Sequence, residues 1–159
     1  MEYRIVAISD CPELASLVAQ WRVAAFFNYP GGYTVEQMTA LILEPPVGPE
    51  ETFVLLEHDQ PVGTAGLVHS DLDSRPDLTP WLAGVFVEPA YRRRGYATAL
   101  VRRVEVFAQA ASVSVLWLCT STAETLYARL GWERMETERK GLREVTVMRR
   151  VLQPAQTCR

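Results

Sequence analysis

Apolar and polar residues follow two spacings along this chain, and each spacing predicts one kind of element. Short, mainly apolar runs predict strands at residues 3–8, 53–57, 62–69, 81–87 and 113–118, and two closing strands fit residues 132–139 and 143–151. Apolar residues three and four positions apart predict helices after residue 10, after residue 34, after residue 95 and over 122–130. We therefore expect one α/β domain, with a mixed, mostly antiparallel sheet and helices on both of its faces.

The first two helices each begin with a capping-box spacing. Asp10 stands three residues before Glu13, with Pro12 in the first turn, and Thr34 stands three residues before Gln37. The residues expected on the buried sides are Leu14, Leu17, Val18 and Trp21 in the first helix, and Met38, Leu41 and Ile42 in the second.

The strand over residues 81–87 is almost continuously apolar, which is typical of a central strand covered on both faces. Gly84 interrupts this strand and marks a candidate bulge or close backbone approach. Gly131 is expected to end the helix over 122–130 in the left-handed conformation. The helix after residue 95 is predicted to bury Ala97, Leu100, Val101, Val104 and Ala108.

Composition narrows the class of protein. The chain has 159 residues, 48% hydrophobic and 22% charged, so we expect one domain over 1–152 and a short tail over 153–159. The sequence contains no run long enough to span a membrane and does not begin like a signal peptide. A net charge of −3 argues against a broad nucleic-acid surface.

The cysteines Cys11, Cys119 and Cys158 are odd in number and widely scattered. This argues against a disulfide framework or a metal cluster and favours a reducing compartment, so we expect a cytoplasmic protein without a metal. The chain has only two histidines, His58 and His69, which makes an activated cysteine nucleophile a poor hypothesis.

A strand, a basic loop and a helix follow one another directly between residues 85 and 100. The first N–H groups of a helix have no intrahelical partner, and together with the helix dipole they attract anions. Gly95 allows the backbone to approach a ligand, and Ala97 leaves the first helical turn open. We expect a small polyanion here; the alternative is a solvated turn whose arginines only cover surface.

Two motifs in this half of the chain carry a family resemblance. Val87-Glu88-Pro89-Ala90-Tyr91-Arg92-Arg93-Arg94-Gly95-Tyr96-Ala97 resembles the acyl-CoA pyrophosphate loop of the GNAT acetyltransferases, V-x-P-x-x-[QR]-x-x-G-x-[GA]. Ala123-Glu124-Thr125-Leu126-Tyr127-Ala128-Arg129-Leu130-Gly131-Trp132 resembles the family's A-x-x-(apolar)-Y-x-x-(apolar)-G-(aromatic) segment. The resemblance implies an acyl-CoA N-acyltransferase-like fold with a splayed central parallel strand pair, acetyl-CoA as co-substrate and an amine-bearing small molecule or peptide as acceptor.

The same resemblance implies roles for particular residues. The main chain of Val85, Phe86 and Val87 would pair with the pantetheine arm, because a bulge leaves its polar groups without ladder partners. Tyr127 would protonate the departing thiolate, since a phenol of pKa ~10 is neutral at pH 7; the alternative is a core tyrosine. The residues implied to bind the diphosphate are Arg92, Arg93, Arg94, Gly95, Tyr96, Ala97 and Thr98.

One position departs from the family pattern, and one role is unassigned. Many members have Asn where this chain has Thr120, whose hydroxyl replaces only part of the amide's hydrogen bonding. His69, Asp71 and Asp73 are candidates for the general base by position. A water-mediated route, or an acceptor already partly neutral, explains proton loss equally well.

The acceptor is described only in outline by the sequence. Aromatic rings over residues 26–33 and an acidic loop over 70–80 would suit a cationic amine, although the rings also fit simple packing between helices. Two other functions match the same motifs: a non-catalytic acyl-CoA-binding or sensing module, and a transferase with another acyl donor or an alcohol acceptor. A monomer and a homodimer are equally compatible with the sequence.

Overall fold

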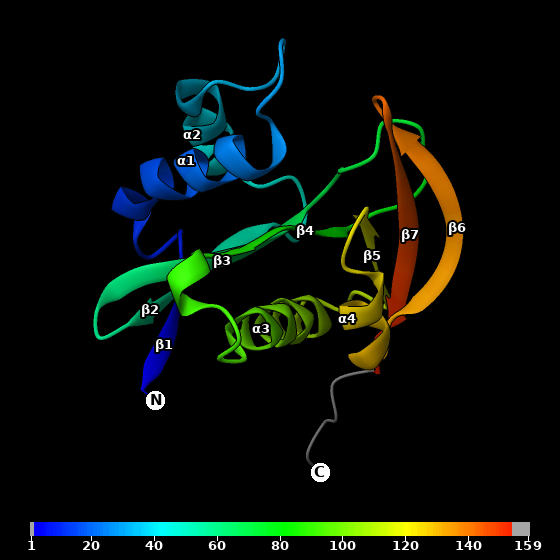
Figure 1. The fold of residues 1–159 in the computed structure, drawn as a ribbon. Coiled ribbons are helices and arrows are strands. Elements are labelled where there is room, and N and C mark those ends of the chain that lie inside the picture. Colours follow the sequence, from blue (N-terminus) through cyan, green and yellow to red (C-terminus); the bar gives the residue numbers. More distant parts are fainter. Residues whose placement is uncertain (1, 154–159) are drawn as a thin grey trace.

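The computed structural model describes residues 2–153, which form seven strands, four α-helices and two short 3-10 turns (Figure 1). The strands are β1 (Tyr3–Ala7), β2 (Glu51–Glu57), β3 (Gln60–Val68), β4 (Trp81–Val87), β5 (Val115–Thr120), β6 (Glu133–Lys140) and β7 (Arg143–Val151). The helices are α1 (Ala15–Phe26), α2 (Val35–Leu43), α3 (Tyr96–Ala110) and α4 (Glu124–Arg129), with short 3-10 turns η1 (Pro12–Leu14) and η2 (Pro89–Tyr91). Residues 154–159 of the expected tail, including Cys158, lie outside the described residues.

The strands form one seven-stranded sheet in the order β1-β2-β3-β4-β5-β7-β6. Only the central β4–β5 pair is parallel; the other neighbours are antiparallel. The predicted fold class, a mixed and mostly antiparallel sheet in an α/β domain, is confirmed.

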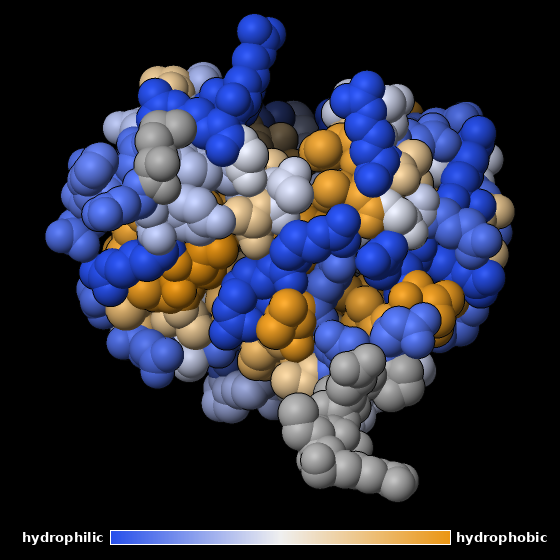
Figure 2. Space-filling view, turned by 90° about the horizontal axis from the view of Figure 1, so that it is seen from below, coloured by the Kyte–Doolittle hydropathy of each residue, from blue (hydrophilic) through white to orange (hydrophobic). Residues whose placement is uncertain are grey.

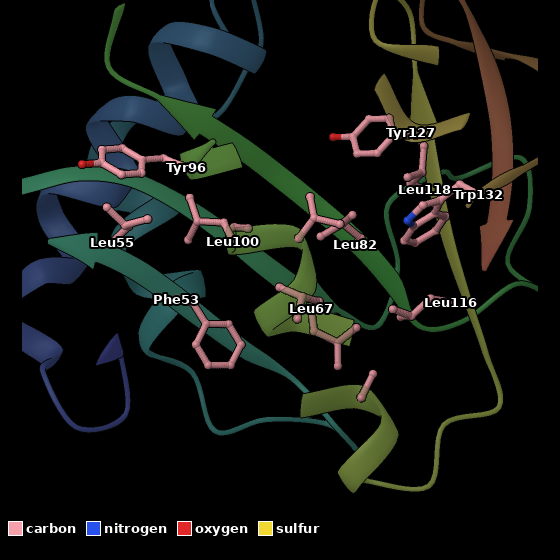
Figure 3. Close-up of a cluster of buried hydrophobic side chains, with 14 of the residues drawn as sticks. Phe53, Leu55, Leu67, Leu82, Tyr96, Leu100, Leu116, Leu118, Tyr127 and Trp132 are labelled. Carbon is pink, nitrogen blue, oxygen red and sulfur yellow. The ribbon is translucent and has the colours of Figure 1, made fainter. Parts of the chain in front are cut away.

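The period-two alternation of strand side chains explains why helices cover both faces. On β2, Phe53 and Leu55 pack against α3, whereas Val54 and Leu56 pack against α1. Figure 1 shows α1 and α2 above the sheet and α3 below it, and Figure 3 shows part of the core that lies between the sheet and α3. The space-filling view from below shows apolar patches among hydrophilic residues on the α3 side (Figure 2). The buried side of α3 is confirmed: Leu100, Val101, Val104 and Ala108 are fully buried, and Ala97 is partly buried.

The two capping predictions had different outcomes. The box at Thr34 is confirmed: Thr34 Oγ1 accepts the Gln37 N–H at 3.1 Å, and Gln37 Oε1 accepts the Thr34 N–H at 3.0 Å. The box at Asp10 is wrong, because Pro12 begins a 3-10 turn and α1 starts only at Ala15. Leu41 is also not buried; it is 42% exposed, because α2 packs on α1 rather than directly on the sheet.

The parallel pair at the centre of the sheet separates soon after it begins. β4 and β5 share a single ladder pair, Trp81 with Trp117, although the strands are seven and six residues long. On the other side of β4, Ala83 lies opposite Gly66 and Phe86 lies opposite Thr64, so β4 carries one extra residue. Gly84 has φ +65° at this bulge, which confirms the prediction made for it.

Candidate active site

The loop between β4 and α3 is shaped to expose backbone N–H groups. Arg93 and Gly95 both have positive φ, at 65° and 81°. Residues in the left-handed conformation next to right-handed ones turn successive backbone N–H groups toward the same side. Helix α3 begins after Gly95, which has no side chain to cap it, and the first helical bond runs from the Ala99 N–H to the Gly95 carbonyl. A Cβ at Gly95 would meet no atom within 4 Å, so the space beside it is open. This geometry suits an anion.

Two of the side chains predicted at the diphosphate contact a carboxylate of the protein. Arg94 Nη1 lies 2.8 Å from Glu57 Oε1, and the Tyr96 hydroxyl donates a hydrogen bond to the same oxygen. The hydrogen bond from Tyr96, with a further contribution from Arg94, lowers the pKa of Glu57. Sequence reasoning missed Glu57, whose signal is a charged residue ending an otherwise apolar strand. These contacts fasten the loop to the end of β2.

Arg92 also contacts the protein at the strand end. Its Nε donates to the Val87 carbonyl at 2.9 Å, and its guanidinium lies 5.8 Å from the centre of the Phe86 ring. The Val87 carbonyl is one of the main-chain groups predicted to face pantetheine, and it already has this partner. The side chains of Arg92 and Arg94 are therefore both engaged by contacts within the protein.

Tyr127 lies in the middle of α4 and is 7% exposed. Its ring packs edge-on against Trp132, with 6.2 Å between ring centres. In Figure 3 its hydroxyl points toward the β4 side of the view and away from Trp132. Burial, with a smaller contribution from Cys119, raises the pKa of Tyr127 to about 12. The phenol is therefore protonated at neutral pH and is able to donate a proton.

Thr120, the position where many relatives have Asn, supports the start of α4. Its Oγ1 accepts the Ala123 N–H at 3.0 Å and the Thr122 N–H at 3.4 Å. The Thr120 hydroxyl thus supplies the hydrogen-bond acceptor for the backbone N–H groups of this turn, and the turn leads into α4, the helix that carries Tyr127.

The three base candidates lie in different surroundings. Asp71 accepts a hydrogen bond from Lys140 at 3.1 Å and another from the Cys119 thiol at 3.4 Å, whereas Asp73 is exposed. His69 Nδ1 lies 3.3 Å from Thr79 Oγ1. His69 also lines a cavity of about 250 Å³, together with Val47, Gly48, Pro49, Thr79 and Pro80.

The neighbouring groups limit what the acidic loop and Cys119 can do. Asp77 is paired with Arg75 at 2.9 Å, and Asp71 with Lys140, so two loop carboxylates already have cationic partners. Burial and the nearby Asp71 raise the pKa of Cys119 to about 12, so its thiolate is scarce at neutral pH. Across residues 2–153, no group of three or more His, Cys, Asp or Glu side chains is placed to hold a metal ion.

The aromatic segment forms a small cluster of its own. Phe27 packs edge-on against Tyr33 at 5.1 Å between ring centres and lies 6.4 Å from Tyr29. Tyr29 is 58% exposed, so part of the cluster faces solvent. The rings therefore pack mainly on one another rather than between helices, and a role for them at the acceptor stays a prediction.

Arg22 is a charged residue near the bulge that sequence reasoning missed. It lies on the buried side of α1, with 8% of its surface exposed, and its Nη2 donates to Thr52 Oγ1 at 3.2 Å. Burial lowers the pKa of Arg22 to about 10. The available signal was the pair Gly66 and Gly84, because glycines inside strands mark close approach of another group.

Comparison with known proteins identifies the class of this fold and then its family. The structure resembles that of an acetyltransferase of the GNAT family from Streptococcus pneumoniae, with a TM-score of 0.68, 18% identity and coverage of 96% of this chain and 100% of that one. It resembles an N-acetyltransferase from Staphylococcus aureus Mu50, with a TM-score of 0.74, 16% identity and coverage of 96% and 100%. An aminoglycoside 6′-N-acetyltransferase complexed with coenzyme A gives a TM-score of 0.73 at 13% identity, with coverage of 99% and 100%. At these identities the likeness shows the acyl-CoA N-acyltransferase fold.

A family model described as an acetyltransferase (GNAT) domain matches residues 48–134, which is more than half of the chain. The chain belongs to the GNAT acetyltransferase family. No curated protein matches the sequence. None of the helices within residues 2–153 is long and apolar enough to cross a membrane.

Proposed function

We propose that this protein is an N-acetyltransferase that moves the acetyl group of acetyl-CoA to a primary amine by direct transfer in a ternary complex. The observation that carries the proposal is the position of two stretches of backbone whose polar groups lack strand or helix partners. One is the edge of β4 beyond Trp81, where the ladder with β5 stops, and the other is the start of α3 after Gly95. Together they suit an extended ligand with amide groups at one end and a diphosphate at the other.

In this proposal the main chain of Val85, Phe86 and Val87 binds the pantetheine arm. The backbone N–H groups of the loop from Arg92 to Thr98 bind the diphosphate, and Arg93 adds long-range attraction. Glu57 holds the loop in this shape through Arg94 and Tyr96. The loop fits the diphosphate of acetyl-CoA, because the space beside Gly95 is open and the α3 N-terminus favours negative charge.

The chemistry requires two proton movements. The neutral amine attacks the acetyl carbonyl, so a C–N bond forms, the C–S bond breaks, and the amine loses a proton to water or to a side chain. The leaving thiolate takes a proton, which Tyr127 donates from its hydroxyl, and the Tyr127 phenolate then takes back a proton from water, equal in number to the one that the amine released. The raised pKa of Tyr127 keeps this hydroxyl protonated before each turnover. Cys119 takes no part, since direct attack needs no thiol nucleophile.

The test is a thiol-release assay with acetyl-CoA and a panel of amines, joined to measurement of the melting temperature with and without acetyl-CoA. A ligand that binds only the folded state adds about 2.7 kcal/mol of stability at 100 times its Kd, so binding is visible as a rise in Tm. We expect both a rise in Tm and amine-dependent thiol release. A rise in Tm without thiol release for any amine would instead identify an acyl-CoA-binding module. Faster release with another acyl-CoA, or with alcohols, would change the donor or the acceptor class.

A further inference from the structure

Arg22 is a buried cation without a buried counter-charge. Its guanidinium makes one hydrogen bond to the protein, from Nη2 to the neutral hydroxyl of Thr52, and its buried Nε has no hydrogen-bond partner. Among the ion pairs of residues 2–153, none includes Arg22. Buried charges in proteins are normally paired, because leaving one without a partner costs several kcal/mol.

The carboxylate of Asp71, which acts on Arg22, does not fill this role. Asp71 acts on Arg22 through space and favours its charged form, but burial outweighs this effect and lowers the pKa of Arg22. Both Asp71 oxygens are engaged elsewhere, one with Lys140 and the other with Cys119. The site therefore holds a positive group that is stabilised from a distance and has an unfilled donor.

The sheet is built to bring this guanidinium to the bulge. A Cβ at Gly66 would lie 2.7 Å from Arg22 Nη2, and a Cβ at Gly84 would lie 2.9 Å from Arg22 Nε. Any other residue at either position would displace the arginine. Gly84 is the bulge residue of β4, so the guanidinium lies over the point where the central strands open. It lies on the α1 side of the sheet, opposite α3.

We propose that Arg22 binds a carboxylate of the acceptor, so that the acceptor is an amine with a carboxylate a few bonds away, as in an α-amino acid. The inference rests on the proposed function, which brings the reacting amine to the open edge of β4. Gly84 lies in β4 itself, so a group bound over Gly84 is close to one that reacts at the open edge of the same strand. The distance between them is on the order of one strand spacing, about 4.8 Å. The planar guanidinium offers paired donors that match a carboxylate.

The experiment uses three matched acceptors: an α-amino acid, its carboxamide and its decarboxylated amine. For the parent protein we expect kcat/KM for the amino acid to exceed both others by about 10- to 100-fold, as expected for a charge-assisted pair in a buried site. In Arg22→Met, which keeps the length of the side chain, this preference should vanish while kcat/KM for the carboxamide changes by only a few-fold. Arg103→Met is the control. Arg103 stacks on Phe53 on the α3 side, 4.6 Å from the ring centre, and its removal should leave the preference intact.

Several results would overturn the inference without touching the proposed function. These are equal or better use of the carboxamide or the decarboxylated amine by the parent, a preference that survives in Arg22→Met, and a preference for the aminophosphonate analogue. If Arg22→Met does not fold, the parent is assayed for Tm with CoA and either the N-acetylated amino acid or its amide. A larger rise with the carboxylate supports the inference, and equal rises contradict it. Failure to acetylate any amine despite a rise in Tm with acetyl-CoA would refute the proposed function itself.

Discussion

The hydroxyl of Tyr96, the first residue of α3, donates a hydrogen bond to the carboxylate of Glu57, the last residue of β2. Arg94 approaches the same carboxylate oxygen from the loop before the helix. One buried acidic group thus joins the basic loop to a strand that is distant in sequence. Arg94 and Tyr96 stand on either side of Gly95, so this junction fastens the part of the loop that turns into α3.

Replacing Glu57 tests whether the junction shapes the binding loop. In Glu57→Gln we expect a lower Tm and a smaller rise in Tm with acetyl-CoA, because the amide oxygen is a weaker acceptor for Tyr96 and carries no charge for Arg94. The pKa of Glu57 is lowered in the folded protein, so its contribution is present above the ordinary glutamate pKa of 4.5 and is lost as pH falls through the folded value. The Tm difference between parent and variant should therefore shrink on acidification below this pH.

The control is Glu133→Gln, which removes an exposed ion pair with Arg149. Exposed pairs contribute little, so this change should leave Tm and acetyl-CoA binding almost unaltered. Equal effects of the two substitutions would show that Glu57 has no special part in the loop.

Gly95→Glu should abolish the rise in Tm caused by acetyl-CoA. The substitution adds bulk and negative charge in the open space where we place the diphosphate. Because Gly95 has φ +81°, any side chain there also costs about 1–2 kcal/mol of backbone strain. Gly141→Glu is the matched control, since Gly141 has φ +64° and equally open surroundings in the β6–β7 turn. If the Gly95→Glu protein folds and binds CoA as well as the parent does, this loop is not part of the CoA-binding site.

Tyr127→Phe should retain acetyl-CoA binding and lower kcat by about 100-fold or more, the usual contribution of a positioned proton donor. The loss should shrink for acyl donors whose thiol is less basic, because such a leaving group needs the proton less. Since the pKa of Tyr127 is about 12, its hydroxyl stays protonated up to about pH 10, and kcat of the parent should not fall over this range through deprotonation of Tyr127. Tyr3→Phe serves as control, because the Tyr3 side chain is 47% exposed and the substitution keeps its ring against Tyr96. An unchanged kcat with chemistry rate-limiting would exclude Tyr127 as the acid.

Gly84→Ala should destabilise the protein more than Gly31→Ala. Both glycines have positive φ, so each alanine substitution destabilises the folded state by about 1–2 kcal/mol through strain of the left-handed backbone conformation. Only at Gly84 does the new methyl group meet another residue, Arg22 Nε at 2.9 Å, whereas at Gly31 it meets nothing within 4 Å. Overpacking adds about 1–3 kcal/mol, which thermal or denaturant unfolding resolves. Equal destabilisation of the two variants would mean that Arg22 moves aside freely.

Much of this molecule follows from local patterns in the chain. The apolar run over 81–87 predicts a central strand, and Gly84 predicts its bulge, because a glycine inside such a run serves backbone geometry rather than packing. The spacing of Thr34 and Gln37 predicts a helix start that the structure confirms, because both bonds of the box are local. Asp10 and Glu13 have the same spacing, yet Pro12 and the packing of α1 move the helix start to Ala15.

The sequence by itself determined the order of the elements, the anion-favouring loop before α3 and the family, since each rests on residues close together in the chain. Tertiary structure decided which charges meet. Glu57 reaches Tyr96 and Arg94 across the turn to α3, and Asp71 pairs with Lys140 rather than with Arg22. Such contacts join residues far apart in sequence, so no local spacing encodes them. Arg22 shows this most clearly. From the sequence alone an arginine in a helix is expected to be exposed to solvent, but Gly66 and Gly84 have no side chains and leave room for Arg22 to be buried against the sheet.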